Sequence, residues 1–229
     1  MTNIQFAHPH TLFTQVEGVL KKVGPKKFFS SPNESVKKAR EGFAAYFFAL
    51  ALKQYTKRDW WLAQYDQAVR AYPDFDFISF GEAFEGMKLE HVELTGVYPH
   101  FKTFDEVMGV IKKKQKQYGT DALKFSLLVF MNHEKSEEWI QLLRKNLISE
   151  YPFISVWTIH LRFKKGGLEV GKAVASKIFS LPGLRVEADM DDSEIHKRQP
   201  IPNYMEITNK NCFTYVSFKP AFVNKMKPS

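Results

Sequence analysis

The chain is short of cysteine and of long apolar runs. Cys212 is the only cysteine among the 229 residues, which excludes an internal disulfide framework and a zinc site built from several cysteines. The longest apolar run, Phe43 to Leu52, is about half as long as a membrane-spanning helix. The first 14 residues lack the charged start and apolar stretch of a signal peptide. These absences predict a cytoplasmic protein that does not enter the membrane.

Several motifs of common enzyme classes are also missing. The sequence has no Walker phosphate-binding loop, no glycine-rich dinucleotide loop, no Gly-x-Ser-x-Gly and no His-Glu-x-x-His. Kinases, dinucleotide-dependent dehydrogenases, α/β-hydrolases and zinc proteases of the last motif therefore lose support as functional classes.

Acidic residues are in the minority. There are 33 Lys and Arg against 25 Asp and Glu, which gives a formal net charge of +8. An excess of this kind favours polyanionic partners, DNA first and RNA as the alternative. A solvated basic surface without a nucleic-acid partner accounts for the charge equally well. A homo-oligomer is compatible with the same composition.

Capping signals and residue periodicity predict the secondary structure. The segment Ser31-Pro32-Asn33-Glu34 predicts a helix start with Ser31 as the cap, and the helix should run over 32–55. Thr103-Phe104-Asp105-Glu106 predicts a second helix that ends at Tyr118. Further helices are expected from Ser136 to Ile148 and from Leu168 to Leu181. Strands are expected at Trp60–Tyr65, Phe75–Phe80, Lys88–Tyr98, Phe125–Met131, Ile154–Phe163, Leu184–Ala188 and Cys212–Phe218.

This order of elements predicts an α/β fold with a central mixed β-sheet flanked by helices. The first three strands are expected to form a meander, and crossover helices should join the later ones. We expect a basic N-terminal segment over residues 1–30, an α/β core over 31–165 and a C-terminal extension over 166–229 packed on that core. The polar stretch before Cys212 is expected to be a long loop.

Acidic side chains occur on two neighbouring predicted strands of this basic protein. Asp74 and Asp76 open the first of them, and Glu93 lies inside the second. If the strands pair, either aspartate could lie beside Glu93, because side chains on a strand alternate between its faces. Two carboxylates held together need a cation, and oxygen ligands of this kind suit Mg²⁺ or Mn²⁺.

These residues and this order resemble the PD-(D/E)XK, or restriction-endonuclease-like, nuclease superfamily. Members carry a helix, a strand with an Asp, a strand with Glu-x-Lys, then a helix and a further strand. Here Pro73-Asp74 and Glu93-Leu94-Thr95 stand for the two motif elements, with 18 residues between Asp74 and Glu93. The resemblance covers about residues 31–163. It implies a magnesium-dependent endonuclease that hydrolyses DNA, such as a restriction or defence enzyme, with Asp74, Asp76 and Glu93 as metal ligands.

Thr95 departs from the family pattern, because it stands where the family has a catalytic lysine. A threonine cannot supply positive charge, so either the site is impaired or a lysine arrives from elsewhere. Lys114 is the candidate, since the helix that carries it follows the Glu93 strand and should pack back along it. The predicted phosphate-contacting side chains are those of Lys112, Lys113, Lys116, Arg162 and Lys164.

Glu41 is a further candidate metal ligand, because the first helix of such nucleases often lends a glutamate to the site. The alternative is a salt bridge from Glu41 to Lys37 or Lys38. Two other functions stay open for the whole chain. One is a non-catalytic nucleic-acid-binding protein on the same fold, with Thr95 marking lost activity. The other is a structural or interaction protein whose acids form surface salt bridges.

Overall fold

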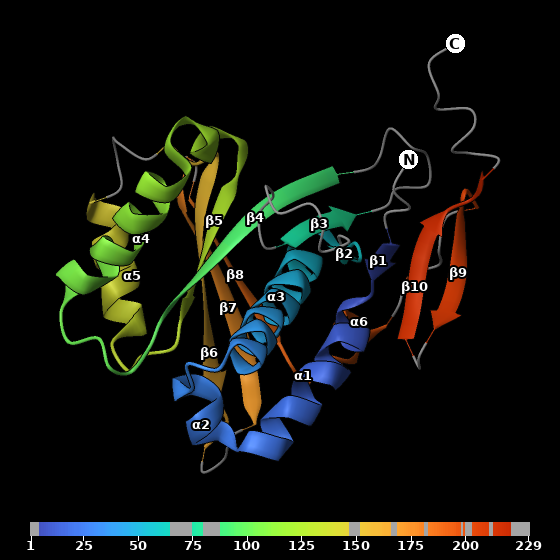
Figure 1. Ribbon diagram of the computed structural model, residues 1–229, viewed down its shortest axis with the longest axis horizontal. Coiled ribbons are helices and arrows are strands. Elements are labelled where there is room, and N and C mark those ends of the chain that lie inside the picture. The colour runs from blue at the N-terminus through green and yellow to red at the C-terminus, as the bar shows by residue number, and fades with distance from the viewer. Residues whose placement is uncertain are drawn as a thin grey trace.

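The computed structural model describes residues 5–64, 75–79, 88–146, 152–165, 169–180, 183–197, 199, 203–210 and 213–220. These residues form an α/β structure with a mixed sheet flanked by helices, as predicted (Figure 1). The described helices are α1 (Pro9–Val23), α2 (Pro25–Ser30), α3 (Glu34–Thr56), α4 (Phe104–Tyr118), α5 (Ser136–Asn146) and α6 (Ser193–His196), with a 3₁₀ helix, η2, at Gly119–Lys124.

Ten described strands hydrogen-bond in the order β8-β7-β6-β5-β4-β3-β2-β1-β10-β9. The strands are β1 (Gln5–Ala7), β2 (Trp61–Gln64), β3 (Phe75–Ser79), β4 (Lys88–Val97), β5 (Ser126–Met131), β6 (Ser155–Phe163), β7 (Val170–Phe179), β8 (Leu184–Asp189), β9 (Met205–Lys210) and β10 (Phe213–Phe218). The pairs β2–β3 and β3–β4 are antiparallel, whereas β4–β5 and β5–β6 are parallel. Parallel neighbours need crossovers, which α4 and α5 provide.

The ends of two helices show which capping signals operate. Thr103 and Glu106 form the predicted capping box at the start of α4. The cap of α3 is Asn33 and not Ser31, because the Asn33 side chain accepts hydrogen bonds from the amides of Ser35 at 3.0 Å and Val36 at 3.4 Å. Ser31 instead ends α2, where its amide donates to the Lys27 carbonyl at 2.9 Å. Because Ser31 belongs to the end of α2, the cap of α3 lies two residues later than predicted.

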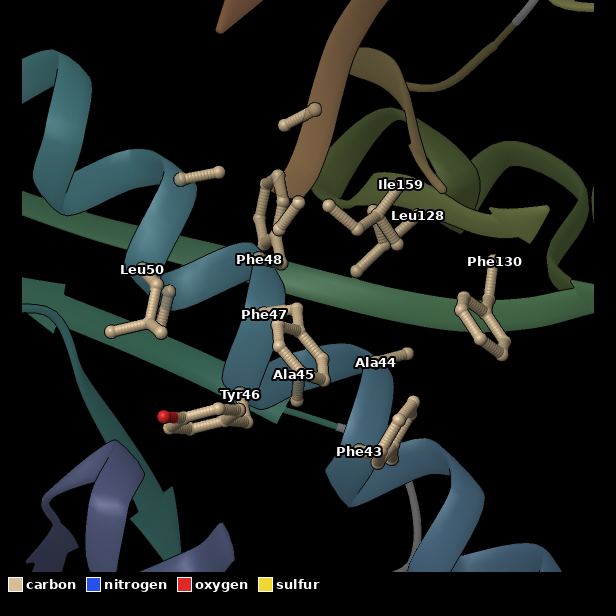
Figure 2. Packing of buried hydrophobic residues seen from close by; sticks show 14 of the residues in the cluster. Phe43, Ala44, Ala45, Tyr46, Phe47, Phe48, Leu50, Leu128, Phe130 and Ile159 are labelled. Atoms are coloured by element: carbon tan, nitrogen blue, oxygen red, sulfur yellow. The ribbon is translucent and has the colours of Figure 1, made fainter. Parts of the chain in front are cut away.

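Helices cover both faces of the sheet (Figure 1). The face beneath α3 is aromatic: the Phe48 ring lies 5.4 Å from Trp157, and the Phe43 ring lies 6.2 Å from Phe130, between centroids. Figure 2 shows Phe48 on the side of α3 that faces the sheet residues Leu128 and Ile159. The other face packs against α4 and α5 through a separate cluster that includes Val97 and Val129. Strand β5 is buried along its whole length between these layers, which fits its predicted place as a central strand.

The segment Leu168–Leu181, predicted as a helix, contains strand β7 instead. Its alanines and lysines are good helix formers, but the residues from Ala173 to Ser176 are all buried. Strand β7 pairs with β6 on one side and β8 on the other, so pairing and burial outweigh local preference. The polar stretch before Cys212 is likewise not one long loop, because it holds α6 and β9.

The described parts of the terminal segments belong to the same core as the middle of the chain. Val16 of α1 and Ala188 of β8 lie in one buried cluster with α3. Strand β1 pairs with β2 and β10, which joins the N-terminal residues to the C-terminal hairpin. Among the described residues, no helix is long and apolar enough to cross a membrane.

Candidate active site

Glu93 lies in the middle of β4 with its carboxylate beneath α4. The residue is 2% exposed. The Lys114 ammonium donates a hydrogen bond to Glu93 Oε1, and the Tyr118 hydroxyl donates to Oε2 at 2.6 Å. Lys114 and Tyr118 are one turn apart on α4, so both reach the same carboxylate. Two hydrogen-bond donors on one buried carboxylate satisfy both of its oxygens and hold it in one orientation.

Strand geometry explains why Glu93 meets α4. Val92 and Leu94 pack in the cluster under α3, and Val97 packs in the cluster under α4. Side chains alternate between the faces of a strand, so Glu93 and Thr95 belong to the α4 face. Thr95 is half-buried there. The Lys114 ammonium reaches this face from α4, the next helix along the chain.

Asp76 lies on the same face as Glu93. Its neighbour Phe77 packs in the α3 cluster, which turns Asp76 toward the α4 side. Asp76 pairs with position 91, two residues before Glu93, and is 2% exposed. Diagonal neighbours of this kind have Cα atoms about 7–8 Å apart. Asp74, the other predicted ligand, lies outside the described residues.

Glu41 is not brought to this site. It belongs to α3, which covers the opposite face of the sheet from Glu93. Its carboxylate lies 3.7 Å from the Lys37 ammonium, one helical turn earlier. The alternative to metal binding that the sequence left open, a salt bridge between Glu41 and Lys37, is present.

The predicted phosphate contacts divide into two groups. Lys112, Lys113 and Lys116 are exposed on α4 beside Lys114, and none of them forms a salt bridge with a described residue. Lys164 is paired with Asp191 at 2.7 Å and Glu169 at 2.8 Å, and these hydrogen bonds raise the pKa of its ammonium. Two carboxylates of the protein therefore already compensate the charge of the Lys164 ammonium.

Arg162 is also committed within the protein. It pairs with Glu137 of α5 and lies 3.4 Å from Glu187 of β8. Hydrogen bonds from Arg185 and then Arg162 hold the pKa of Glu137 well below its ordinary range. Glu137 also accepts from His160 Nε2 at 2.9 Å, while burial of that imidazole lowers its pKa. This network ties α5 to the β6–β8 part of the sheet and has the character of a structural contact.

Tyr118 is the site residue that sequence reasoning did not select. Its spacing from Val107, Ile111 and Lys114 did place it on the inward face of the helix. What the pattern did not give is the hydroxyl contact with Glu93, because register between helix and strand depends on packing. The sequence pattern that could have identified Tyr118 is its position four residues, one helical turn, after Lys114.

Comparison of the chain with protein-family models, with curated proteins and with solved structures finds no match. The case for a metal site therefore depends on the side chains of this chain alone. Asp76 and Glu93 are hard oxygen donors on one face of adjacent strands, and Mg²⁺ binds proteins through one or two carboxylates together with water and substrate oxygens. Within the described ranges, no group of three or more His, Cys, Asp or Glu side chains is arranged to hold a metal ion.

Proposed function

We propose that this protein is a magnesium- or manganese-dependent nuclease that hydrolyses phosphodiester bonds in DNA. The observation that carries the proposal is the contact between Lys114 and Glu93. The Lys114 ammonium supplies a cation on the same face of the sheet as the acidic residues. Thr95, on that face, cannot supply one. The order α3, β2, β3, β4, α4, β5 adds support, with the acidic residues on β3 and β4.

Each residue of the site has a chemical task in this proposal. A divalent ion held by Glu93 and an aspartate of the Asp74–Asp76 segment would lower the pKa of a bound water and neutralise developing charge. In the transition state the scissile phosphate gains negative charge, and the positive charge of Lys114 would stabilise it. Tyr118 orients the Glu93 carboxylate through its hydroxyl, as second partners of metal-ligating carboxylates do.

The exposed lysines of α4 supply the grip on the nucleic acid. Lys112, Lys113 and Lys116 lie on the helix that carries Lys114, so phosphates bound there would lie near the site. Contacts of this kind are electrostatic and independent of sequence. Arg162 and Lys164 are left out of this surface because acidic side chains of the protein already hold them.

The burial of Glu93 favours a second candidate, a non-catalytic nucleic-acid-binding protein. The carboxylate is nearly inaccessible, and both of its oxygens already accept hydrogen bonds. A metal ion would have to compete with the Lys114 ammonium for the same oxygen. In this reading the Glu93–Lys114 pair fastens α4 to the sheet, and the α4 lysines alone carry the function.

Incubation of the pure protein with plasmid DNA, with and without Mg²⁺ or Mn²⁺, separates the two candidates. The nuclease proposal expects metal-dependent cleavage that Glu93→Gln and Lys114→Ala abolish under conditions where urea unfolding shows both variants to be folded, while DNA binding stays nearly intact. Lys113→Ala is the matched control, because it removes a neighbouring charge that points to solvent; it should only weaken binding in a salt-dependent way. Salt-sensitive binding without cleavage under either metal would select the binding protein. Equal cleavage by the wild type and Lys114→Ala would discard the role of Lys114.

A further inference from the structure

An apolar cavity of about 470 Å³ lies between α1, α2, α3 and the nearby ends of β6, β7 and β8. It is on the α3 side of the sheet, away from Glu93, and is independent of the proposed nuclease function. Its volume falls within the range of about 300–1,000 Å³ that is usual for small-molecule sites. The side chains that give it its character are Phe13, Phe29, Phe43, Tyr46, Phe47 and Phe163.

The walls are aromatic rings that already pack against one another. The Phe13 ring stacks on Tyr46 at 4.3 Å, and the Phe43 ring meets Phe47 at 4.9 Å, between centroids. Phe163 lies at the cavity and is 42% exposed, so its ring is accessible to a ligand there. Rings arranged in this way favour stacked and edge-on contacts with another aromatic ring.

The charges around the cavity cancel. Glu17 and Lys21 both line it and form a salt bridge at 2.8 Å. Glu169, also in the lining, is paired with Lys164 at 2.8 Å. Neither an anion nor a cation would find an unmatched charge of opposite sign among these groups. The lining therefore favours an uncharged ligand.

His196 gives the cavity a specific polar group. Its Nε2 lies 3.0 Å from the Met190 carbonyl, and a carbonyl can only accept a hydrogen bond. In the neutral imidazole the proton is then on Nε2, which leaves Nδ1 as an acceptor. The Tyr46 hydroxyl is a second uncharged polar group of the lining and lies 3.3 Å from His10 Nδ1; burial raises its pKa, so it stays protonated.

We propose that this cavity binds an uncharged aromatic small molecule that carries one O–H or N–H donor, as phenols and indoles do. The aromatic walls hold the ring, and His196 Nδ1 accepts the hydrogen bond. The carboxylates of Glu17 and Glu169 are already paired with lysines, so the lining offers no unpaired charge at these residues to a charged analogue.

The test is calorimetric titration at pH 8 with three probes of one shape: 2-naphthol, 2-methoxynaphthalene and 2-naphthoate. We expect saturable one-to-one binding of 2-naphthol, with 2-methoxynaphthalene weaker by about 3- to 10-fold because it lacks the donor. His196→Ala should remove that difference between the two neutral probes. Equal affinity of the neutral probes for the wild type, or a preference for 2-naphthoate, would overturn the assigned ligand class.

Two variants test the place of binding. Leu20→Trp fills the cavity from α1, and Phe163→Ala removes an exposed wall without touching the buried cluster. Both should weaken 2-naphthol binding by at least about tenfold, a change of roughly 1.4 kcal/mol. Ile207→Ala, an exposed apolar side chain on β9, is the control and should leave binding unchanged. Undiminished binding by folded Phe163→Ala, or no saturable binding by the wild type, would overturn the proposal.

Discussion

The ammonium of Lys114 hydrogen-bonds to Glu93 Oε1 and joins the second half of α4 to the centre of β4. The two residues are 21 positions apart along the chain. Glu93 is buried and Lys114 is mostly buried, with 21% of its side chain exposed. A buried ion pair loses much of its hydration. Removal of one charge therefore destabilises the protein more than it would in a pair on the surface, because the remaining charge is left buried without a partner.

Lys114→Met should therefore destabilise the protein strongly, by about 3–5 kcal/mol, because it leaves the Glu93 carboxylate buried without its cation. The double variant Glu93→Leu with Lys114→Met should recover most of that loss, since both charges are then gone. Urea unfolding of the wild type, both single variants and the double variant measures the coupling. A double variant that is as unstable as the sum of the single ones would show that the pair contributes no mutual stabilisation.

Tyr118→Phe removes the second donor to Glu93 and keeps the ring. A hydrogen bond to a charged acceptor contributes about 1.5–3 kcal/mol, so the unfolding free energy should fall by that order. Tyr55→Phe is the control, because Tyr55 is 57% exposed and should tolerate loss of its hydroxyl. Equal losses in the two variants would indicate that the Tyr118 hydroxyl is not held by Glu93.

The sequence predicted the elements around Glu93 well, because the strongest local signals lie there. The Thr103–Glu106 capping box and the apolar run of β5 need no tertiary information. The prediction failed for β7, where three of the four residues from Ala173 to Ser176 are alanine or serine and all four are buried by their neighbours. The hydrogen bonds and burial that β7 gains between β6 and β8 outweigh the helix preference of its alanines and lysines.

The site was predictable in part for the same reason. Alternation along β4 placed Glu93 and Thr95 on one face, and helical spacing placed Lys114 and Tyr118 together. The order of elements predicts that α4 packs on β4. It does not predict which side chains meet, because the register between a helix and a strand depends on packing. For Glu41 the sequence left a metal ligand and a salt bridge as alternatives, and the structure shows the ion pair with Lys37 one turn away.

Asp59 should control the acid stability of the fold. Burial alone would raise the pKa of this carboxyl, but the neighbouring His8 imidazole and Lys53 ammonium, together with a hydrogen bond from the Gln199 amide, outweigh it and lower the pKa to about 2. The pKa of the folded state then lies below the ordinary value of 3.8. The stabilisation is present above pH 4 and is lost as the pH falls toward 2, with a size of about 2 kcal/mol.

Asp59→Asn tests this directly. The variant should lose stability at pH 7, and its difference from the wild type should shrink as the pH is lowered from 4 to 2. Urea unfolding at pH 7, 4, 3 and 2.5 measures the difference. The contact at 2.6 Å between Lys53 Nζ and Asp59 Oδ1 motivates the expectation. A difference that stays constant over this range would assign the effect of the substitution to packing and not to the carboxylate charge.

The salt dependence of DNA binding should distinguish free lysines from paired ones. Each lysine that contacts a phosphate contributes about 0.9 to the slope of log affinity against log salt concentration. Lys112→Ala, Lys113→Ala and Lys116→Ala should each reduce the slope by about that amount, because these side chains are exposed and carry unmatched charge. Lys164→Ala should leave the slope unchanged, since Asp191 and Glu169 already hold its ammonium. Fluorescence anisotropy with a labelled duplex at four salt concentrations gives the slopes. An equal reduction by Lys164→Ala would show that the paired lysine exchanges its carboxylates for phosphate, and the DNA-binding surface would then extend from α4 to the end of β6.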